Sequence, residues 1–545
     1  MTDTDSQHIL GWLPDDADVQ PFDEASVKDR LGRLQQAIFI ARRNEELVLA
    51  DAGCRLQGQN AANSGLPVVA FVPPVAEASL GDRTFCADYN ISYPYVAGSM
   101  ANGISSVELV VAMARAGMLG FFGAAGRPIP DVEAAIARVR AELTDEPFGF
   151  NLIHQPSEPS LEAATVDLYI RESINLIEAS AFLGLTLPIV RYRLHGIHQD
   201  ADGRVVTPNR VIAKVSRVEI ASKFMSPPPA AMIEELIASG DLTAEQAELA
   251  RRIPVAQDIT AEADSGGHTD RRPAMCLIPT MLALRDRMQA QYKYEQPLRV
   301  GAAGGIATPS SVAAAFAMGA AYIVGGSVHQ CTIEAGTSQI VREMLATTEQ
   351  ADTTMAPAAD MFEMGVKLQV LKRGTMFPMR AAKLYEVYCE YADLTAMPPD
   401  ELEKLEKTIF RMTLSEVWTD TESFFRERDP SQLVRAATDA RHKMALIFRW
   451  YLGQASRWAN NGTANRQIDF QVWCGPAMGA FNEWVQGSFL HAVAARSIEV
   501  VARNLLYGAA VLERANAMAR QGISVPPEWI GAVPRPLNEI QENSG

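Results

Sequence analysis

The chain has 545 residues, 48% of them hydrophobic, so it can bury more than one core and we expect two or three domains. Its 65 acidic side chains outnumber 49 basic ones, and a net charge of −16 argues against nucleic acid and anionic membranes as partners. Six cysteines without a CxxC pair and eight histidines without HExxH spacing predict neither a disulfide framework nor a protein-held metal.

The start of the chain carries no motif with an evident chemistry. Its first residues, MTDTDSQHIL, are acidic and lack the apolar stretch of a secretory signal, and no run of about 18 apolar residues follows. We therefore expect a cytoplasmic protein. Residues 1–86 are predicted to form an N-terminal extension, with a helix around Ser26 to Ile38 and a strand in ELVLAD.

From Tyr93 onward, short apolar segments alternate with amphipathic ones, which is typical of parallel βα units. Residues 87–350 are therefore predicted to fold as a closed (β/α)8 TIM barrel, an α/β fold. The eight strands are expected near Tyr95, Leu119, Phe150, Ile189, Ala213, Thr260, Val300 and Val324. Helices are expected over Ser106 to Ala116, Asp131 to Leu143, Leu161 to Phe182, Pro279 to Gln291 and Pro309 to Met318.

Two connections of this barrel depart from the plain pattern. Between the fourth and fifth strands, YRLHGIHQDADGRVVTPN indicates a turn-rich hairpin without a helix. Between the fifth and sixth, residues 226–254 indicate an inserted helical hairpin that turns at Ser239-Gly240-Asp241. Beyond the barrel, residues 351–545 have helical periodicity and hold six of the seven tryptophans, which predicts a mostly helical C-terminal domain.

Residues 299–328, RVGAAGGIATPSSVAAAFAMGAAYIVGGSV, contain the clearest sign of a binding site. They predict strand, glycine turn, helix, strand and glycine turn, with Thr308 as the helix N-cap and Pro309 at its first position. Gly304-Gly305 and Gly325-Gly326-Ser327 end successive parallel strands and leave backbone N–H groups open to an anion. We predict a phosphate cup there, as in many eight-stranded barrels; the alternative is that these glycines only allow tight turns.

Other strand ends place polar or soft side chains at the same mouth. Gly98, Ser99 and Met100 follow the first strand, where bare backbone and a thioether suit a flat ring, although Met100 would serve equally as core packing. Asn151 ends the third strand and Lys214 lies in the apolar fifth strand. Both are candidate site residues, against the alternatives of a loop tie for Asn151 and a buried ion pair for Lys214.

The sixth strand ends in the densest group of ionisable residues, ITAEADSGGHTDRRP. Glu262 leads into Ser265-Gly266-Gly267, whose backbone can approach a ligand, and His268 follows. A histidine beyond a Gly-Gly turn can act as a general acid or base near neutral pH. We predict that His268 is catalytic; the purely structural alternative is a loop histidine bonded to Asp264 or Asp270.

These motifs together resemble the FMN-dependent nitronate monooxygenase and enoyl reductase superfamily of barrels, over roughly residues 90–350. Longer strings look like the PfaD-type, trans-acting enoyl reductases of polyunsaturated fatty acid and polyketide synthases, over almost the whole chain. These strings are EADSGGHTDRRP, APAADMFEMGVKLQVLKRGTMFPMRAAKLYEVY, FRWYLGQASRWANNG and WCGPAMGAFNEWVQGSFL.

The resemblance implies a chemistry: NADPH or NADH as hydride donor, FMN as carrier, and an enoyl thioester on an acyl carrier protein as substrate. His268 would polarise the thioester carbonyl or protonate Cα, with Lys214 second, and the C-terminal domain would bind substrate or carrier. A homodimer is a further expectation. Competing hypotheses are a nitronate monooxygenase and a catalytically silent scaffold. The expected FMN contacts are Gly98, Ser99, Met100, Asn151, Lys214, Glu262, Ser265, Gly266, Gly267, Gly304, Gly305, Gly325, Gly326 and Ser327.

Acyl carrier proteins are generally acidic, so docking on a chain of net charge −16 requires a local basic patch. The segment GVKLQVLKRGTMFPMRAAKLYEVY offers one, as two predicted helical pieces broken at Gly374 and Pro378. The alternative is an ordinary solvated helix face. The cations of this predicted docking patch are Lys367, Lys372, Arg373, Arg380 and Lys383.

Overall fold

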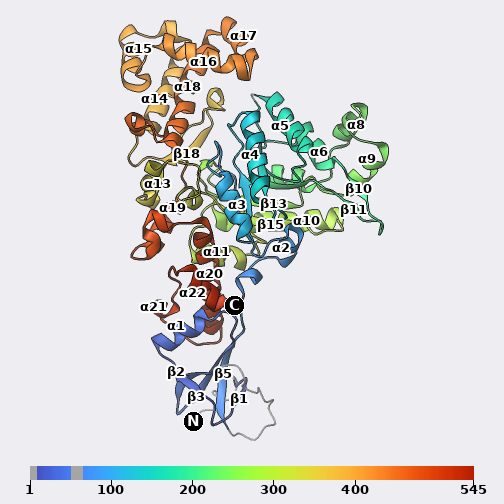
Figure 1. The fold of residues 1–545 in the computed structure, drawn as a ribbon, viewed down its shortest axis with the longest axis vertical. Helices are drawn as coiled ribbons and strands as arrows, with labels where there is room; N and C mark the ends of the chain where they lie inside the picture. Colours follow the sequence, from blue (N-terminus) through green and yellow to red (C-terminus); the bar gives the residue numbers. More distant parts are fainter. Residues whose placement is uncertain (1–8, 51–64, 157, 545) are drawn as a thin grey trace.

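The computed structural model describes residues 9–50, 65–156 and 158–544. Figure 1 shows a small N-terminal sheet, a barrel, and a column of C-terminal helices that meets the sheet at one end and lies beside the barrel. Residues 1–8 lie outside the described ranges. They make up most of the acidic N-terminal segment from which the lack of a secretory signal is predicted.

The N-terminal extension folds as a five-stranded antiparallel sheet in the order β1-β5-β3-β4-β2. The predicted strand in ELVLAD is confirmed, but the predicted helix ends early, at Gly32 of α1 (Glu24–Gly32). Ile38, the last residue of the predicted helix, instead begins the segment IFIARR, whose β-branched and aromatic side chains suit a strand that pairs on both sides. The strands are β1 (Gly11–Leu13), β2 (Val19–Pro21), β3 (Ile38–Arg43), β4 (Glu46–Ala50) and β5 (Leu66–Val72).

The predicted barrel is confirmed as a closed ring of eight parallel strands in the order β12-β13-β15-β16-β6-β7-β8-β9. Seven of the eight lie where the sequence predicts. In chain order the strands are β6 (Tyr95–Ala97), β7 (Leu119–Phe122), β8 (Gly149–Ile153), β9 (Leu176–Ser180), β12 (Arg210–Val215), β13 (Asp258–Glu262), β15 (Arg299–Ala303) and β16 (Ile323–Gly325).

The fourth strand is the exception, and the prediction near Ile189 is wrong. The helix expected to reach Phe182 ends at Arg171 as α5 (Pro159–Arg171), and LIEAS forms β9. Ser173 has a φ of 49°, the left-handed conformation that separates the two elements. The apolar run LPIVR instead begins α6 (Leu187–Leu194), which follows Thr186, has a proline in its first turn and buries Ile189 and Val190 of this run.

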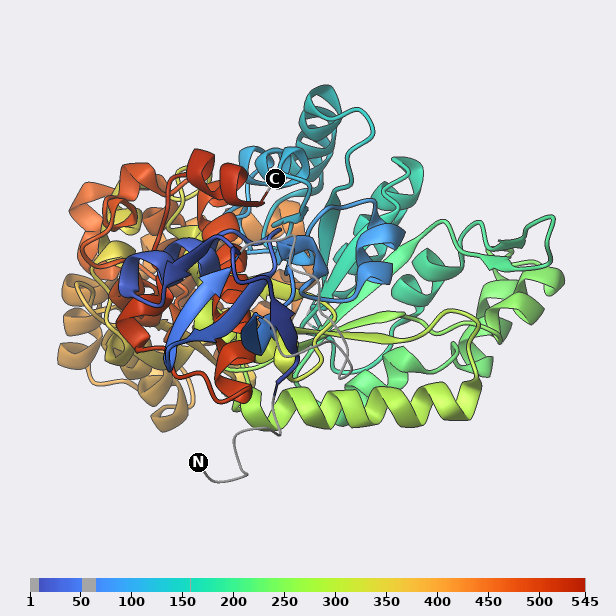
Figure 2. The same cartoon turned by 90° about the horizontal axis from the view of Figure 1, so that it is seen from below.

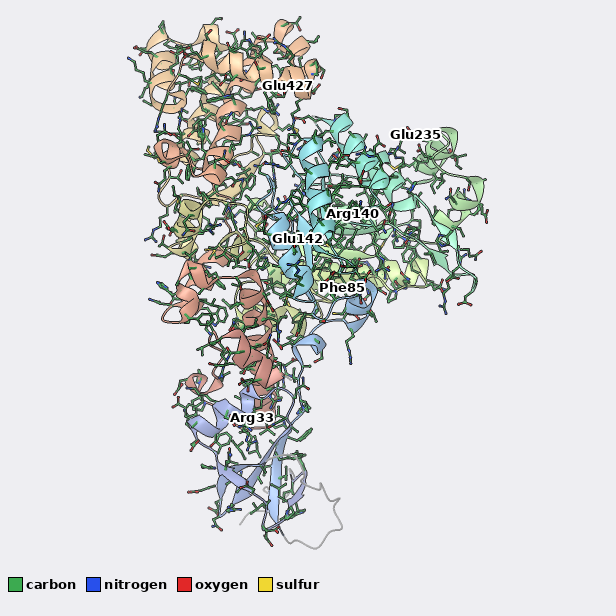
Figure 3. All side chains as sticks on the ribbon, in the orientation of Figure 1. Arg33, Phe85, Arg140, Glu142, Glu235 and Glu427 are labelled. Carbon is green, nitrogen blue, oxygen red and sulfur yellow. The ribbon has the colours of Figure 1, made fainter. Side chains whose placement is uncertain are left out.

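The barrel helices are α3 (Val107–Arg115), α4 (Ile129–Glu142), α7 (Val218–Met225), α10 (Ala274–Tyr292) and α11 (Pro309–Ala317). Thr308 caps α11 as predicted. The predicted hairpin is β10 (His198–Gln199) with β11 (Val205–Val206), but the prediction of no helix in this connection is wrong, because α6 lies between β9 and β12. The inserted helices are α8 (Ala230–Ala238) and α9 (Ala244–Ala250). Figure 3 places Glu235 of α8 at the outer end of the molecule, away from the C-terminal column.

The closed end of the barrel is held by a buried ion pair. Arg299 of β15 donates to Asp258 of β13 over 2.6 and 3.1 Å, and Tyr89 of α2 (Arg83–Tyr89) donates to the same carboxylate over 2.7 Å. Phe85 of α2, labelled in Figure 3, stacks on Tyr322 with ring centroids 4.1 Å apart. The helix α2 therefore closes the end opposite the glycine turns.

The C-terminal region begins with a sheet element that the sequence analysis did not predict. The strands β17 (Thr353–Pro357) and β18 (Lys367–Leu371) pair with each other, and β18 also pairs with β14 (Gly267–His268) of the barrel. The first of the two helical pieces expected around Gly374 is therefore a strand. A strand of this kind exposes one edge, and here the edge is used to hold a barrel loop.

The rest of the C-terminal region is helical, as predicted. Figure 2 shows these helices on one side of the molecule and the barrel on the other, and α20 packs on α11, α3 and β5, so it joins all three parts. In the described part of the chain, no helix is both long and apolar enough to cross a membrane. The main helices are α14 (Phe377–Glu390), α16 (Leu414–Arg428), α17 (Pro430–Thr438), α18 (Ala440–Asn461), α19 (Ala477–Val485) and α20 (Ile498–Arg520).

We expect Asp258→Ala to lower the free energy of unfolding by about 3–5 kcal/mol, because it leaves the buried Arg299 guanidinium without its main partner. Asp88→Ala is the matched control: this partly exposed carboxylate also contacts Arg299, over 2.7 Å, and its loss should cost about 1 kcal/mol or less. Urea unfolding followed by tryptophan fluorescence measures both. Equal losses would contradict the assignment of the ion pair as the closure of the barrel.

Candidate active site

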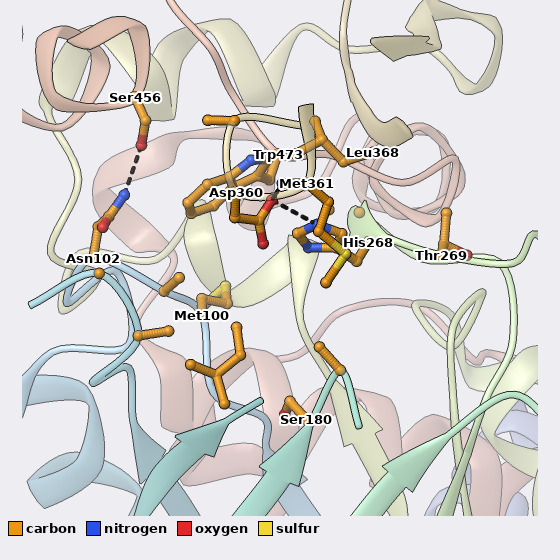
Figure 4. A pocket seen from close by; sticks show the side chains of 18 of the residues that line it. Met100, Asn102, Ser180, His268, Thr269, Asp360, Met361, Leu368, Ser456 and Trp473 are labelled. Atoms are coloured by element: carbon orange, nitrogen blue, oxygen red, sulfur yellow. Dashed lines mark hydrogen bonds and ion pairs between the residues drawn. The ribbon is translucent and has the colours of Figure 1, made fainter. Parts of the chain in front are cut away.

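A cavity of about 910 Å³ lies between the strand ends of the barrel and the C-terminal region. Figure 4 shows Met100 and Ser180 on the barrel side and Trp473 on the opposite side. Every site residue predicted from the sequence lines this cavity, including those of the two glycine turns and the His268 loop. The structure thus brings the predicted residues together, and it adds a second wall that belongs to the C-terminal region.

The predicted phosphate cup is open at Gly305 and Gly326. A Cβ at either position would meet no atom within 4 Å, and the N–H of Gly305 donates to no atom of the described chain. Gly304 has a different reason to be glycine, because its Cβ would lie 2.6 Å from the carbonyl carbon of Ala263. Gly304 and Gly305 both have positive φ, 79° and 78°, where glycine is favoured.

The second turn is supported from below by a buried pair. The hydroxyl of Tyr95 lies 2.8 Å from Nε2 of His329. Burial lowers the pKa of His329 to about 4, so its ring is neutral. A Cβ on Gly325 would lie 2.5 Å from that ring, so Gly325 serves packing. The hydroxyl of Ser327 accepts a hydrogen bond from the Gly475 N–H over 3.1 Å and ties the turn to the C-terminal region.

Two glutamates and one lysine form a row of charges across the barrel mouth. Lys214 of β12 lies 3.6 Å from Glu178 of β9 and 3.6 Å from Glu262 of β13. Glu178 accepts hydrogen bonds from the N–H of Ser99, over 2.9 Å, and from its hydroxyl. Burial opposes the charge of Lys214, but the two glutamates raise its pKa above the ordinary value, and burial raises the pKa of Glu262. Lys214 is therefore a permanent cation and a weak proton donor.

Glu178 was missed by the sequence analysis because its strand was assigned to a helix. It is fully buried, and its second oxygen, Oε1, has no hydrogen-bond partner in the described part of the chain. Asn151 lies beside it, donating to the Glu178 carbonyl over 3.0 Å and to the Ser180 hydroxyl over 3.1 Å. The alternative of a loop tie for Asn151 therefore holds in part, although its side chain also lines the cavity.

His268 faces a carboxylate that the sequence analysis did not single out. Its Nε2 lies 3.2 Å from Oδ1 of Asp360, in the turn between β17 and β18 (Figure 4). Burial opposes protonation of His268, but the bond to Asp360 raises its pKa above the ordinary 6.5. The expected alternative partner Asp270 is instead held by Arg217 through two hydrogen bonds of 2.8 Å, which lower its pKa to about 2.

The loop that carries His268 is fixed by the C-terminal region. Gln369 of β18 donates to Asp264 over 3.0 Å and to the Ser265 carbonyl over 2.8 Å. Gly266 packs on Gly475 so closely that a Cβ on Gly266 would lie 3.0 Å from the Gly475 nitrogen, and one on Gly475 would lie 2.9 Å from the Gly266 nitrogen. Neither glycine of this contact has room for a side chain.

The predicted docking patch is weaker than its five cations suggest. Lys367 and Lys372 are exposed, and Lys367 also lines the cavity, so docking there stays a hypothesis that rests on these two. The other three pair with carboxylates: Arg373 with Glu349 and Asp352, Arg380 with Asp469, and Lys383 with Glu401.

Three family models match the chain. The model for nitronate monooxygenase matches residues 83–416, which includes the whole barrel. Four strands of the N-terminal sheet, β2 to β5, fall within a match to the N-terminal domain of the fatty acid synthase subunit PfaD, residues 16–74. Residues 391–470, which include α16 to α18, match the inserted helical domain of [acyl-carrier-protein] S-malonyltransferase.

Among known proteins, the chain is 48% identical over 82% of its length to a polyunsaturated fatty acid synthase protein of Thraustochytrium sp., and covers 30% of that protein. It is 43% identical over 82% of its length to polyketide biosynthesis protein PksE of Bacillus subtilis, and covers 58% of it. The chain thus spans less than two thirds of these relatives. The solved enoyl reductase domain of MlnA from Bacillus amyloliquefaciens matches with 41% identity and a TM-score of 0.76, over 82% of this chain and 99% of that domain. The resemblance stated from the sequence is confirmed.

We expect Asp360→Asn to lower the pKa of His268, because burial then opposes protonation without the Asp360 carboxylate. NMR titration of a protein with labelled histidine rings measures this pKa. Because the folded-state pKa lies above 6.5, the pair stabilises the fold at low pH, and that stability is lost as the pH rises through the folded pKa.

Asp420→Asn is the matched control for this titration, since Asp420 also lines the cavity and has no contact with His268. It should leave the His268 pKa unchanged. The same pKa in wild type and Asp360→Asn would remove Asp360 from the account of His268.

Proposed function

The chain belongs to the nitronate monooxygenase family, and from this premise we propose that it is a flavin-dependent enoyl reductase of polyketide or polyunsaturated fatty acid synthesis. One observation carries the proposal: the likeness to a solved enoyl reductase domain extends over 82% of the chain, more than the barrel alone. The likeness therefore extends into the C-terminal region, which supplies the second wall of the cavity.

The residues of the cavity fit FMN. The open space at Gly305 and Gly326, with the unpaired N–H of Gly305 in the described chain, suits a phosphate. Met100, Ser99 and Asn151 line the barrel side, where a ring system would lie against them. FMN bound here would carry hydride from NADPH or NADH to the β carbon of an enoyl thioester.

The ionisable residues divide the remaining work. The pKa of His268 lies above its ordinary value, so the ring can donate a hydrogen bond to the thioester carbonyl or a proton to Cα, while Asp360 holds it in place. Lys214 is held charged by Glu178 and Glu262, so it contributes a fixed positive charge at the mouth and not a mobile proton. This reasoning favours His268 over Lys214 as the proton donor.

The substrate class follows from the family of relatives and from the size of the cavity. Proteins of polyunsaturated fatty acid and polyketide synthesis are the relatives, which supports an enoyl thioester borne by an acyl carrier protein. A cavity of about 910 Å³ has room for an extended acyl segment beside a cofactor. The expected homodimer stays a prediction.

We expect Gly305→Val to purify without FMN, because its side chain would fill the space in which we place the phosphate. Flavin absorbance per protein measures occupancy. Gly240→Val is the matched control: Gly240 has nearly the same φ, 80° against 78°, and equal free space, but lies in the inserted hairpin. Full flavin content in Gly305→Val would place the phosphate elsewhere.

Wild-type protein should oxidise NADPH or NADH when given crotonyl-N-acetylcysteamine, with butyryl thioester as product. His268→Gln should retain flavin and lose a factor of about 10² to 10⁴ in turnover, the usual size of a general acid–base contribution. Oxygen consumption on a nitroalkane, without thioester reduction, would instead assign nitronate monooxygenase activity. Activity on neither substrate would favour a scaffold.

A further inference from the structure

The C-terminal wall of the cavity carries three arginines that the proposed chemistry does not use. Arg428 lies at the end of α16, and Arg449 and Arg457 lie on α18, two helical turns apart. All three line the cavity, on the side away from the glycine turns. Arg449 is half-buried and Arg457 is exposed at the rim.

An aromatic ring groups two of these arginines. The guanidinium carbons of Arg428 and Arg457 each lie 5.4 Å from the centre of the Phe424 ring, and that of Arg449 lies 5.9 Å from the ring of Phe425. Stacking on a ring holds a guanidinium in place while leaving its N–H groups free to donate. The aromatic rings therefore help to fix the positions of Arg449 and Arg457 without an ion pair.

Only one of the three has a counter-charge in contact. Arg428 donates to Glu158 over 2.8 Å, whereas Arg449 and Arg457 make no ion pair or hydrogen bond with any described residue. Asp360 and Asp420 also line the cavity on this side, and neither makes an ion pair with Arg449 or Arg457. Guanidinium groups remain protonated, so two positive charges face the cavity without a partner.

The pKa values of Arg449 and Arg457 also indicate that this wall disfavours positive charge. Burial lowers the pKa of Arg449 and outweighs the opposing effect of the carboxylates of Glu158, Glu363 and Asp360, and the positive charge of Arg428 adds to the lowering. The pKa of Arg457 is lowered by the protein around its guanidinium and by the like charges of Arg428 and Arg127. Positive charge on this wall is thus less favourable than in water, and an anion bound between the helices and the cavity would relieve it.

We propose that Arg449 and Arg457, with Arg428, form a phosphate-binding subsite at the rim of the cavity, separate from the cup at Gly305 and Gly326. A pair of forked donors suits a phosphate ester, and Phe424 offers an apolar face beside it. The subsite holds the phosphate of a reactant whose reactive end reaches the barrel mouth.

This proposal rests on the proposed function, under which two reactants bring phosphate into the cavity. One is the nicotinamide dinucleotide, with its pyrophosphate and, in NADPH, a 2′-phosphate. The other is the phosphopantetheine arm of a carrier protein. In both molecules the reactive group is separated from a phosphate, so the phosphate can bind at the rim while the reactive group lies at the barrel mouth.

The test measures binding directly, by titration calorimetry of flavin-loaded protein with two matched ligand pairs. The pairs are NADP⁺ with NAD⁺, and 4′-phosphopantetheine with pantetheine. In Arg449→Gln/Arg457→Gln, we expect affinity for one phosphate-bearing ligand to fall on the order of 10-fold to 100-fold, as for lost charge-assisted hydrogen bonds. The variant Arg449→Gln/Arg457→Lys should retain part of the affinity that Arg449→Gln/Arg457→Gln loses.

The pattern identifies the source. A loss for NADP⁺, with or without NAD⁺, assigns the subsite to the dinucleotide, and a loss for phosphopantetheine alone assigns it to the carrier arm. Arg426→Gln is the control, since Arg426 is also on α16 but pairs with Glu422 and does not line the cavity. Unchanged affinity for every ligand, or no measurable binding to wild type, overturns the subsite.

The failure of the subsite is distinguishable from failure of the proposed function. Crotonyl-N-acetylcysteamine has no phosphate, so its reduction by wild-type protein whose flavin has been chemically reduced tests the proposed function without the subsite. If affinity is unchanged while wild type reduces this thioester, the function stands and the subsite does not. If affinity falls while wild type reduces no thioester, the subsite stands and the function does not.

Discussion

The geometry of the candidate site depends on the contacts by which the C-terminal region holds the His268 loop of the barrel. The strand pairing of Gly267 and His268 with β18, the two hydrogen bonds from Gln369, and the contact of Gly266 with Gly475 together fix a loop that would otherwise be exposed. Asp360, from the same C-terminal sheet, then orients His268. The barrel alone supplies the two glycine turns, whereas the position of the histidine depends on the C-terminal region, so residues far apart in the sequence form one site.

The buried charged residues at the two ends of the barrel have different roles. At the closed end, Asp258 and Arg299 satisfy each other in a fully enclosed pair that stabilises the fold. At the open end, Lys214 is shared by Glu178 and Glu262 at the longer distance of 3.6 Å, and Glu178 keeps one oxygen unpaired in the described chain. Incomplete satisfaction of buried polar groups is costly, and it is expected where a ligand supplies the missing partner.

Local signals in the sequence predict most of this architecture. Paired glycines, the Thr308 cap and the βα alternation identify seven barrel strands and the two glycine turns, because each depends on backbone conformation encoded nearby. The fourth strand was misassigned because LIEAS follows a helix without glycine or proline, while LPIVR has the composition of a strand. Glu178 was lost with it. Asp360 and Gln369 act through pairing with a loop about 100 residues away, which no local pattern reports.

The most direct test of the central claim, that this shared site reduces an enoyl thioester, is an anaerobic single turnover. Protein whose flavin has been chemically reduced is mixed with crotonyl-N-acetylcysteamine, and flavin absorbance and thioester products are followed together. The account predicts that oxidised-flavin absorbance returns without oxygen and that one equivalent of butyryl thioester forms per flavin. Absorbance that returns only after oxygen is admitted, with the crotonyl thioester recovered intact, would contradict it.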